Sequence, residues 1–113
     1  MHHLTFGRYR RLLFLTVLEA ARNVARTTER PDGVSERAWN RWEAGEAPIP
    51  QQVADNLTKL VAQRQALLDS LAAMGGSYTP TTQKDNIVAY KIAQSVAAQA
   101  AAMGINIGDA QDG

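Results

Sequence analysis

Cysteine is absent from this sequence, and its only histidines, His2 and His3, stand at the N-terminal end. Without thiols there can be no disulfide, no thiolate zinc site and no cysteine nucleophile. Without a histidine in the body of the chain, we expect no histidine-based triad, metal site or acid–base pair there. These absences remove a large share of enzyme chemistry. The sequence therefore predicts a protein that is not an enzyme and carries no metal or cofactor.

Long hydrophobic runs are also absent. Residues 12–18 follow three arginines and so imitate a signal peptide, but Thr16 interrupts the run and Glu19 follows without a small-residue cleavage site. No stretch approaches the roughly 20 apolar residues that span a bilayer. We expect a cytoplasmic protein without membrane contact. With 113 residues, 45% of them hydrophobic, the chain is predicted to form one domain, or one small domain plus an appendage.

Net charge is nearly absent as well, at +1, but the charges are unevenly distributed. Residues 1–45 carry eight arginines and five acidic residues, whereas residues 46–113 carry four basic and six acidic residues. Every Lys or Arg in the first part is arginine, whose forked guanidinium suits phosphate and guanine. A solvated surface is the ordinary interpretation of such a pattern, so the asymmetry alone does not decide the function.

Hydrophobic periodicity predicts five helices and no strand, over about residues 5–13, 17–26, 36–44, 51–74 and 84–103. Buried candidates in the first helix are Leu4, Tyr9, Leu12 and Leu13. A capping box from Thr16 to Glu19 opens the second helix, and Ser35 caps the third. Gly45 stands where a left-handed residue ends a helix. The predicted fold class is all-α.

The fourth predicted helix is long for so small a chain. At 1.5 Å per residue it extends about 35 Å, and its apolar stripe exceeds what three short helices can cover. The remainder must contact the last helix or a second copy of the chain. Arg64 lies within the stripe, and a side chain that extends to solvent explains it better than a salt bridge across an interface. Candidate dimerisation residues are Leu60, Leu67, Leu71, Val88, Ile92 and Val96.

The third predicted helix has two distinct faces. On a wheel at about 100° per residue, both tryptophans fall on one side together with Ala38. The opposite side carries Arg37, Asn40, Arg41 and Ala44, with Glu36 at its edge. Tryptophan buries a large apolar area, so we expect the first side to pack in a core rather than stack on single-stranded nucleic acid. In the major groove, arginine can form two hydrogen bonds to guanine, and asparagine can form two to adenine. The second side of the helix therefore carries the side chains that read DNA bases.

Two segments resemble a known family. Residues 16–25, T-V-L-E-A-A-R-N-V-A, resemble the second helix of the phage-repressor (Xre-type) helix-turn-helix family, and residues 34–45, V-S-E-R-A-W-N-R-W-E-A-G, resemble its third helix. A narrower resemblance, to the YdiL-like family, covers about residues 8–98. It rests on R-R-L-L-F-L-T-V-x-E-A-A, on W-x-x-W-E-x-G-x-x-x-I-P and on D-N-I-V-A-Y-K-I-A-Q-S-V-A-A. That family includes anti-CRISPR-associated autorepressors of phages and mobile elements.

The resemblance implies a phage-repressor-like helix-turn-helix bundle, which we place at residues 4–50. The residue pattern adds a long helix plus a C-terminal dimerisation helix over residues 51–103 and a flexible tail over residues 104–113. The resemblance further implies a transcriptional repressor that binds double-stranded DNA as a homodimer, at an inverted repeat in its own promoter. The matching DNA-facing positions are Ser35, Glu36, Arg37, Asn40, Arg41 and the cap Thr16. The matching structural positions are Ala21, Val24, Trp39, Trp42 and Gly45. Val17 departs from the pattern, since many members carry glutamine there.

The turn between the second and third helices is longer than the family pattern. Residues 26–33 replace a connection that is usually only a few residues. We expect the second helix to extend or the turn to loop out, with the geometry of the helix pair preserved. Arg26 and Arg30 would then reach phosphate groups, although Glu29 and Asp32 favour a passive surface insertion.

Two other functions are compatible with the sequence. A helical protein-interaction module, such as an antitoxin or an adaptor, would use the long fourth helix and the alanine-rich last helix to bind a different protein. An RNA-binding regulator of its own message would use the same arginines on a different nucleic acid. Co-purification with a partner protein would identify the first, and competition between duplex DNA and transcript would identify the second.

Overall fold

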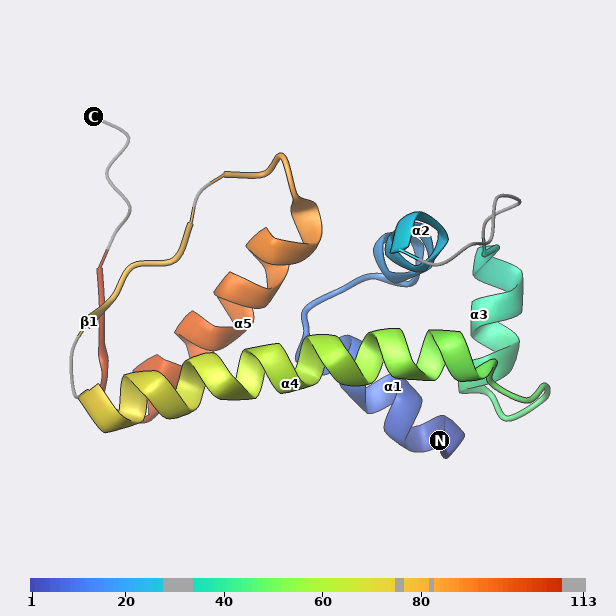
Figure 1. The fold of residues 1–113 in the computed structure, drawn as a ribbon, viewed down its shortest axis with the longest axis horizontal. Helices are drawn as coiled ribbons and strands as arrows, with labels where there is room; N and C mark the ends of the chain where they lie inside the picture. Colours follow the sequence, from blue (N-terminus) through green and yellow to red (C-terminus); the bar gives the residue numbers. More distant parts are fainter. Residues whose placement is uncertain (28–33, 75–76, 82, 109–113) are drawn as a thin grey trace.

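The structure, a computed structural model, describes residues 1–27, 34–74, 77–81 and 83–108. The five helices are α1 (His3–Leu12), α2 (Val17–Thr27), α3 (Glu36–Glu43), α4 (Gln51–Met74) and α5 (Ile87–Ala102). Two short strands follow α4 and α5, namely β1 (Ser77–Tyr78) and β2 (Asn106–Ile107). The all-α class is confirmed. Figure 1 shows α4 running the length of the molecule, with α1, α2 and α3 near its start and α5 near its end.

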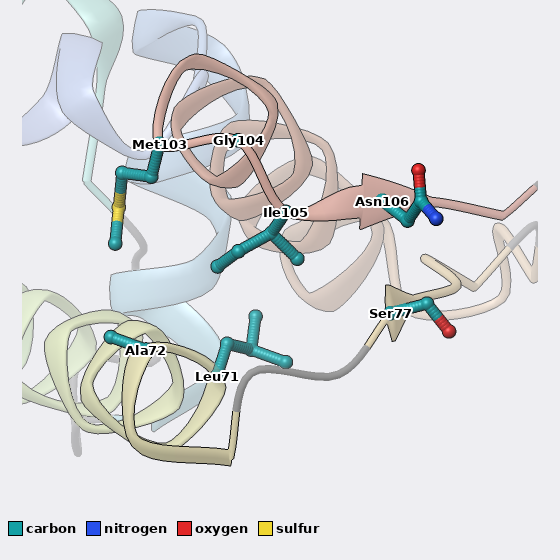
Figure 2. A pocket seen from close by; sticks show the side chains of 7 residues that line it. All are labelled: Leu71, Ala72, Ser77, Met103, Gly104, Ile105 and Asn106. Carbon is teal, nitrogen blue, oxygen red and sulfur yellow. The ribbon is translucent and has the colours of Figure 1, made fainter.

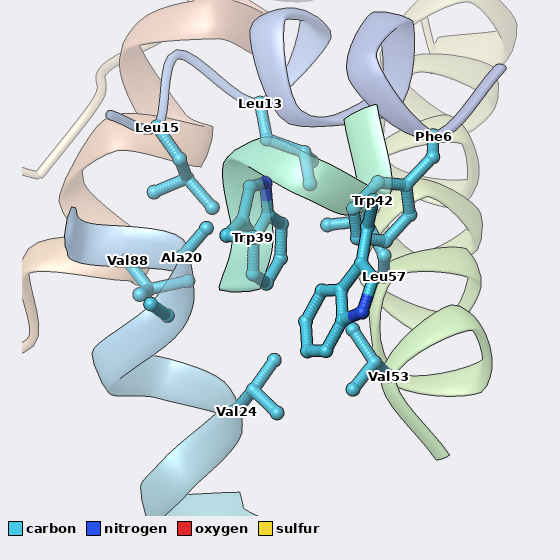
Figure 3. Packing of buried hydrophobic residues seen from close by; sticks show 11 residues of the cluster. Phe6, Leu13, Leu15, Ala20, Val24, Trp39, Trp42, Val53, Leu57 and Val88 are labelled. Atoms are coloured by element: carbon cyan, nitrogen blue, oxygen red, sulfur yellow. The ribbon is translucent and has the colours of Figure 1, made fainter. Parts of the chain in front are cut away.

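The main core lies between α1, α2, α3 and the first half of α4. Trp39 is fully buried at its centre, with ring centroids 4.7 Å from Phe6 and 5.8 Å from Trp42. Figure 3 shows both indoles enclosed by Phe6 of α1 and by aliphatic side chains from the α1–α2 connection, α2, α4 and α5. The inward face predicted for α3 is therefore confirmed, and its tryptophans are not available for stacking on bases.

The register of α1 differs from the prediction. Leu13 is buried as expected and Tyr9 is half-buried, but Leu4 is 58% exposed and Leu12 is 37% exposed. Phe6, which was not among the predicted buried residues, is fully buried instead. The helix begins at His3 because the His2 side chain accepts a hydrogen bond from the Leu4 N–H and so caps it. Phe6 and Leu13, seven residues apart, then share one face of the helix.

A smaller second core forms where α4 and α5 approach their C-terminal ends. Among the described residues, Leu68, Val96 and Ala100 are buried there, surrounded by half-buried side chains of Leu67, Leu71, Tyr78, Ile92, Ile105 and Ile107. β1 and β2 pair in parallel beside it, with Ser77 opposite Asn106 and Tyr78 opposite Ile107. The prediction of no strand is therefore wrong. The expected flexible tail also begins too early at residue 104, since Ile105 and Ile107 pack on this core, while residues 109–113 lie outside the described residues.

Arg64 lies between α4 and α5 rather than at the surface. Its residue is only 4% exposed, its Nε donates to Ser95 Oγ at 3.1 Å, and its Nη2 donates to Gln99 Oε1 at 2.6 Å. The predicted extension to solvent is wrong. Burial lowers the pKa of Arg64, yet a guanidinium starts so high that it stays charged at neutral pH. The second core therefore contains a positive charge that is held by neutral oxygen atoms.

Candidate nucleic-acid interface

The outward face of α3 is exposed along its length. Glu36, Arg37, Asn40 and Arg41 are all exposed, and together with Ala44 and Glu46 they line a shallow surface hollow. No helix of the described chain lies over this hollow. The face is therefore exposed to solvent, and it presents two guanidinium groups and an amide side by side.

Both ends of α3 are defined by their sequence. At the start, Ser35 adopts an extended backbone and its Oγ accepts a hydrogen bond from the Ala38 N–H at 3.0 Å. At the end, Gly45 has φ of +77°, which glycine adopts without the strain that a side chain would cause. The predictions for Ser35 and Gly45 as cap and terminator are confirmed. The helix is consequently short, with few positions that a ligand can contact.

Helix α2 begins at the predicted capping box. Thr16 Oγ1 accepts from the Glu19 N–H at 3.1 Å, and Glu19 Oε1 accepts from the Thr16 N–H at 2.9 Å. Leu15 and Ala20, on either side of this box, are both buried and fix the angle at which the chain enters the helix. Thr16 itself is exposed at the start of α2, as a phosphate contact would require.

A partly buried carboxylate fixes α3 against α1. Glu43 accepts hydrogen bonds from Arg10 Nε at 2.7 Å and from Arg10 Nη2 at 3.0 Å, and its Oε2 also accepts from Trp39 Nε1. Arg10 Nη1 then donates to the Leu15 carbonyl at 2.9 Å. This network connects the end of α3, the end of α1 and the α1–α2 connection. It determines the rotation of α3 about its axis and therefore which side chains face outward.

The network was not predicted. Arg8, Arg10 and Arg11 form a basic run in α1, and no local pattern distinguishes one of these arginines from the others. Arg10 proves to be the structural member of this group, whereas Arg8 is exposed and the Arg11 side chain is 62% exposed. The spacing of Arg10 and Glu43, 33 residues apart, gives no local periodic signal.

The helix pair stays together despite the longer turn. Ala21 and Val24 of α2 are buried in the same core as Trp39 of α3, and Figure 1 shows α2 end-on while α3 runs across the view. The two helices therefore cross steeply, as in a helix-turn-helix. Helix α2 continues to Thr27, one residue beyond the prediction. Arg30 lies outside the described residues, so its predicted phosphate contact stays a prediction, as does that of Arg26.

The candidate dimerisation residues divide into two groups. Val88 and Val96 are 6% and 0% exposed within the single chain. A second copy of the chain cannot contact these two side chains in this fold, so the prediction that they form the dimer interface is wrong. Leu60, Leu67, Leu71 and Ile92 are half-buried at the edges of the two cores.

The sequence of this chain is similar to known proteins over the helices that carry the α3 face. Residues 1–81 match the Aca2/YdiL-like family, a stretch that contains α1 to α4 and the whole exposed face of α3. The chain belongs to the Aca2/YdiL-like family. A similar relative is the Aca2 repressor of Pectobacterium phage ZF40, which is 29% identical over 103 residues, covering 79% of this chain and 83% of the relative.

Membership of the Aca2/YdiL-like family confirms the resemblance seen in the sequence. Among the described residues, no helix is both long and apolar enough to cross a bilayer. Within the same part of the chain, no three histidine or carboxylate side chains converge to hold a metal ion.

Proposed function

We propose that this chain is a sequence-specific DNA-binding repressor that acts as a homodimer on an inverted repeat in its own promoter. The observation that carries the proposal is the exposed α3 face of Arg37, Asn40 and Arg41, held in place from behind by Glu43 and Trp39. Bidentate base contacts need side chains whose supporting helix does not move, because a small rotation removes both hydrogen bonds. A relative named as a repressor supports the same class.

The near-neutral charge supports base-specific rather than charge-driven binding. Non-specific affinity grows with the number of phosphates that a protein neutralises, and this chain has a net charge of only +1. Contacts from Thr16 and Ser35 at the starts of α2 and α3 would position the chain on the backbone, while Arg37 and Asn40 would read base edges. Specificity in this arrangement comes mainly from α3.

The incomplete second core supports a homodimer. Half-buried Leu67 and Leu71 lie beside a hollow at the end of the molecule, where Met74 is 81% exposed and Met103 is 48% exposed. Figure 2 shows Ile105 and Leu71 pointing towards each other across this hollow. A second copy placed here covers the exposed Met74 and Met103 and leaves both α3 faces free. Sedimentation equilibrium tests this part, and a chain that stays monomeric at micromolar concentration contradicts it.

The central test is the Arg37→Ala variant on DNA from upstream of the chain's own reading frame. Footprinting of the wild type is expected to protect a palindrome whose half-sites lie on one face of the duplex. Arg37→Ala should weaken operator binding by roughly 1–3 kcal/mol and relax the preference at one base pair in each half-site. Fluorescence anisotropy with single-base operator variants measures both effects.

The control removes the same charge elsewhere. Lys84 is exposed on the segment before α5 and stands over the Tyr90 ring, so Lys84→Ala should leave operator affinity unchanged. An equal loss on operator and random duplex for Arg37→Ala would assign Arg37 to a phosphate instead of a base. Tighter binding to the transcript than to duplex DNA would favour an RNA regulator, and no preference among duplexes would refute the proposal.

A further inference from the structure

The turn that ends α1 contains a strained residue. Phe14 has φ of +63°, and among the described residues it is the one non-glycine residue with a positive φ. Its N–H donates to the Arg11 carbonyl at 3.0 Å, and the Leu15 N–H donates to the Arg10 carbonyl at 3.2 Å, which closes the helix in the way a terminating glycine does. Glycine adopts this conformation without cost, whereas a side chain makes it unfavourable.

Burial does not explain why phenylalanine stands there. The Phe14 residue is 46% exposed, and its neighbours Leu12 and Leu18 are 37% and 40% exposed. A residue kept for packing would be enclosed by the core, as Leu13 and Leu15 on either side of it are. Strain that packing does not compensate is typical of residues that contact a ligand.

The surroundings of Phe14 are positively charged. Arg8 and Arg11 are three residues apart and so are neighbours on the surface of α1. Phe14 follows at the C-terminal turn, where its N–H donates to the Arg11 carbonyl. Arg8 is exposed, and the Arg11 side chain is 62% exposed with only a 4.0 Å approach to Glu43. Thr16, at the start of α2, lies two residues further on and is also exposed. An exposed aromatic ring close to exposed guanidinium groups combines apolar area with positive charge, and nucleic acids bind surfaces of this kind.

We propose that Phe14 is a contact to the sugar–phosphate backbone of duplex DNA, beside the phosphates bound by Arg8 and Arg11. This inference rests on the proposed function and adds to it a surface outside α3. The ring packs against the deoxyribose faces, while the two arginines neutralise the flanking phosphates. Such a contact fixes the position of the chain on the duplex and carries no sequence information.

The test uses two variants that accept the same backbone conformation without the ring. In Phe14→Gly and Phe14→Asn, relief of strain offsets the loss of an exposed side chain, so the melting temperature should change by only a few degrees. Affinity should fall roughly fivefold, equally on operator and random duplex, as expected when an apolar contact of moderate area is lost. The slope of log K against log salt concentration should not change, because no charge is removed.

Two further variants complete the design. Arg11→Gln should make the salt dependence shallower by about one phosphate contact. Leu4→Ala removes an exposed apolar side chain at the opposite end of α1 and should change neither affinity nor salt dependence. All measurements use fluorescence anisotropy on the full chain, with sedimentation equilibrium of each variant in parallel.

The outcomes separate this inference from the proposed function. A wild type that binds no duplex refutes the proposed function before any variant is compared. If the wild type binds and the Phe14 variants bind equally well, only the backbone contact is refuted. A change in self-association, or a loss confined to the operator, likewise overturns it, because the ring would then contact protein or bases.

Discussion

Replacing Glu43 by alanine should destabilise the fold more than any other change to a charged residue near α3. The substitution leaves the indole N–H of the fully buried Trp39 without an acceptor, which costs about 1–3 kcal/mol. It also breaks a bidentate ion pair with Arg10 whose side chains are 16% and 15% exposed. The cost of losing such a partly buried pair falls between two limits. Surface pairs contribute about 0–1 kcal/mol, and disruption of a buried pair costs about 3–5 kcal/mol. We therefore expect a total loss of about 2–4 kcal/mol in the free energy of unfolding.

Urea unfolding followed by circular dichroism measures this loss. Glu43→Gln keeps one oxygen that can accept from the Trp39 indole, but it loses the charge and one of the two acceptors for Arg10, so it should cost about 1–2 kcal/mol. Glu46→Ala removes an exposed carboxylate just beyond α3 and should stay within about 0.5 kcal/mol of the wild type. If Glu43→Ala lost less than about 1 kcal/mol with an unchanged urea dependence, the network would not fix α3, and the argument for a rigidly held reading face would fail.

Two further predictions concern the ends of the two cores. Gly45→Ala should lower stability by about 1–2 kcal/mol, because φ is positive and the new Cβ would lie 3.0 Å from His3 Nδ1. Gly104 also has a positive φ, of +85°, but no atom lies near its new Cβ. Gly104→Ala should therefore lose only the stability that the strained backbone costs. Equal losses in thermal melts would exclude a role for His3. Arg64→Met should leave stability within about 1 kcal/mol or raise it, because a buried charge held by neutral partners is costly to desolvate. A loss above about 2 kcal/mol would show that the guanidinium bonds stabilise the pair of helices.

Local patterns predicted the helix-turn-helix region well because its signals are short-range. The Thr16 and Ser35 caps and the Gly45 terminator each depend on residues within one helical turn, and the two tryptophans of α3 share one face at helical spacing. The register of α1 was also within reach of the sequence. With Phe6 as the reference, Leu13 falls about 20° away on the wheel and Leu12 about 120° away, which is the observed division between buried and exposed.

The features that sequence reasoning missed depend on contacts between distant segments. Arg64 is buried because Ser95 and Gln99 of α5 supply oxygen atoms opposite it, and nothing within α4 indicates their presence. β1 and β2 have two residues each, too few for a periodic pattern, and they pair across a separation of almost 30 residues. Glu43 finds Arg10 in the same way, through tertiary packing rather than local spacing.

The two cores are not independent, because α4 and α5 each cross both of them. In α4, Leu57 belongs to the main core and Leu68 to the second; in α5, Val88 belongs to the main core and Val96 to the second. Lys91 of α5 also lies 3.6 Å from Glu19, the residue that caps α2. If either helix loses order in one core, its packing in the other core is weakened as well. In the proposed homodimer, a second copy bound at the end of the molecule that carries the second core would therefore stabilise the helix-turn-helix as well, by mass action on the folded state. Within the proposed function, the dimeric fraction and the fraction of chains with an ordered α3 face then increase together with protein concentration. A repressor of its own promoter requires this response to concentration.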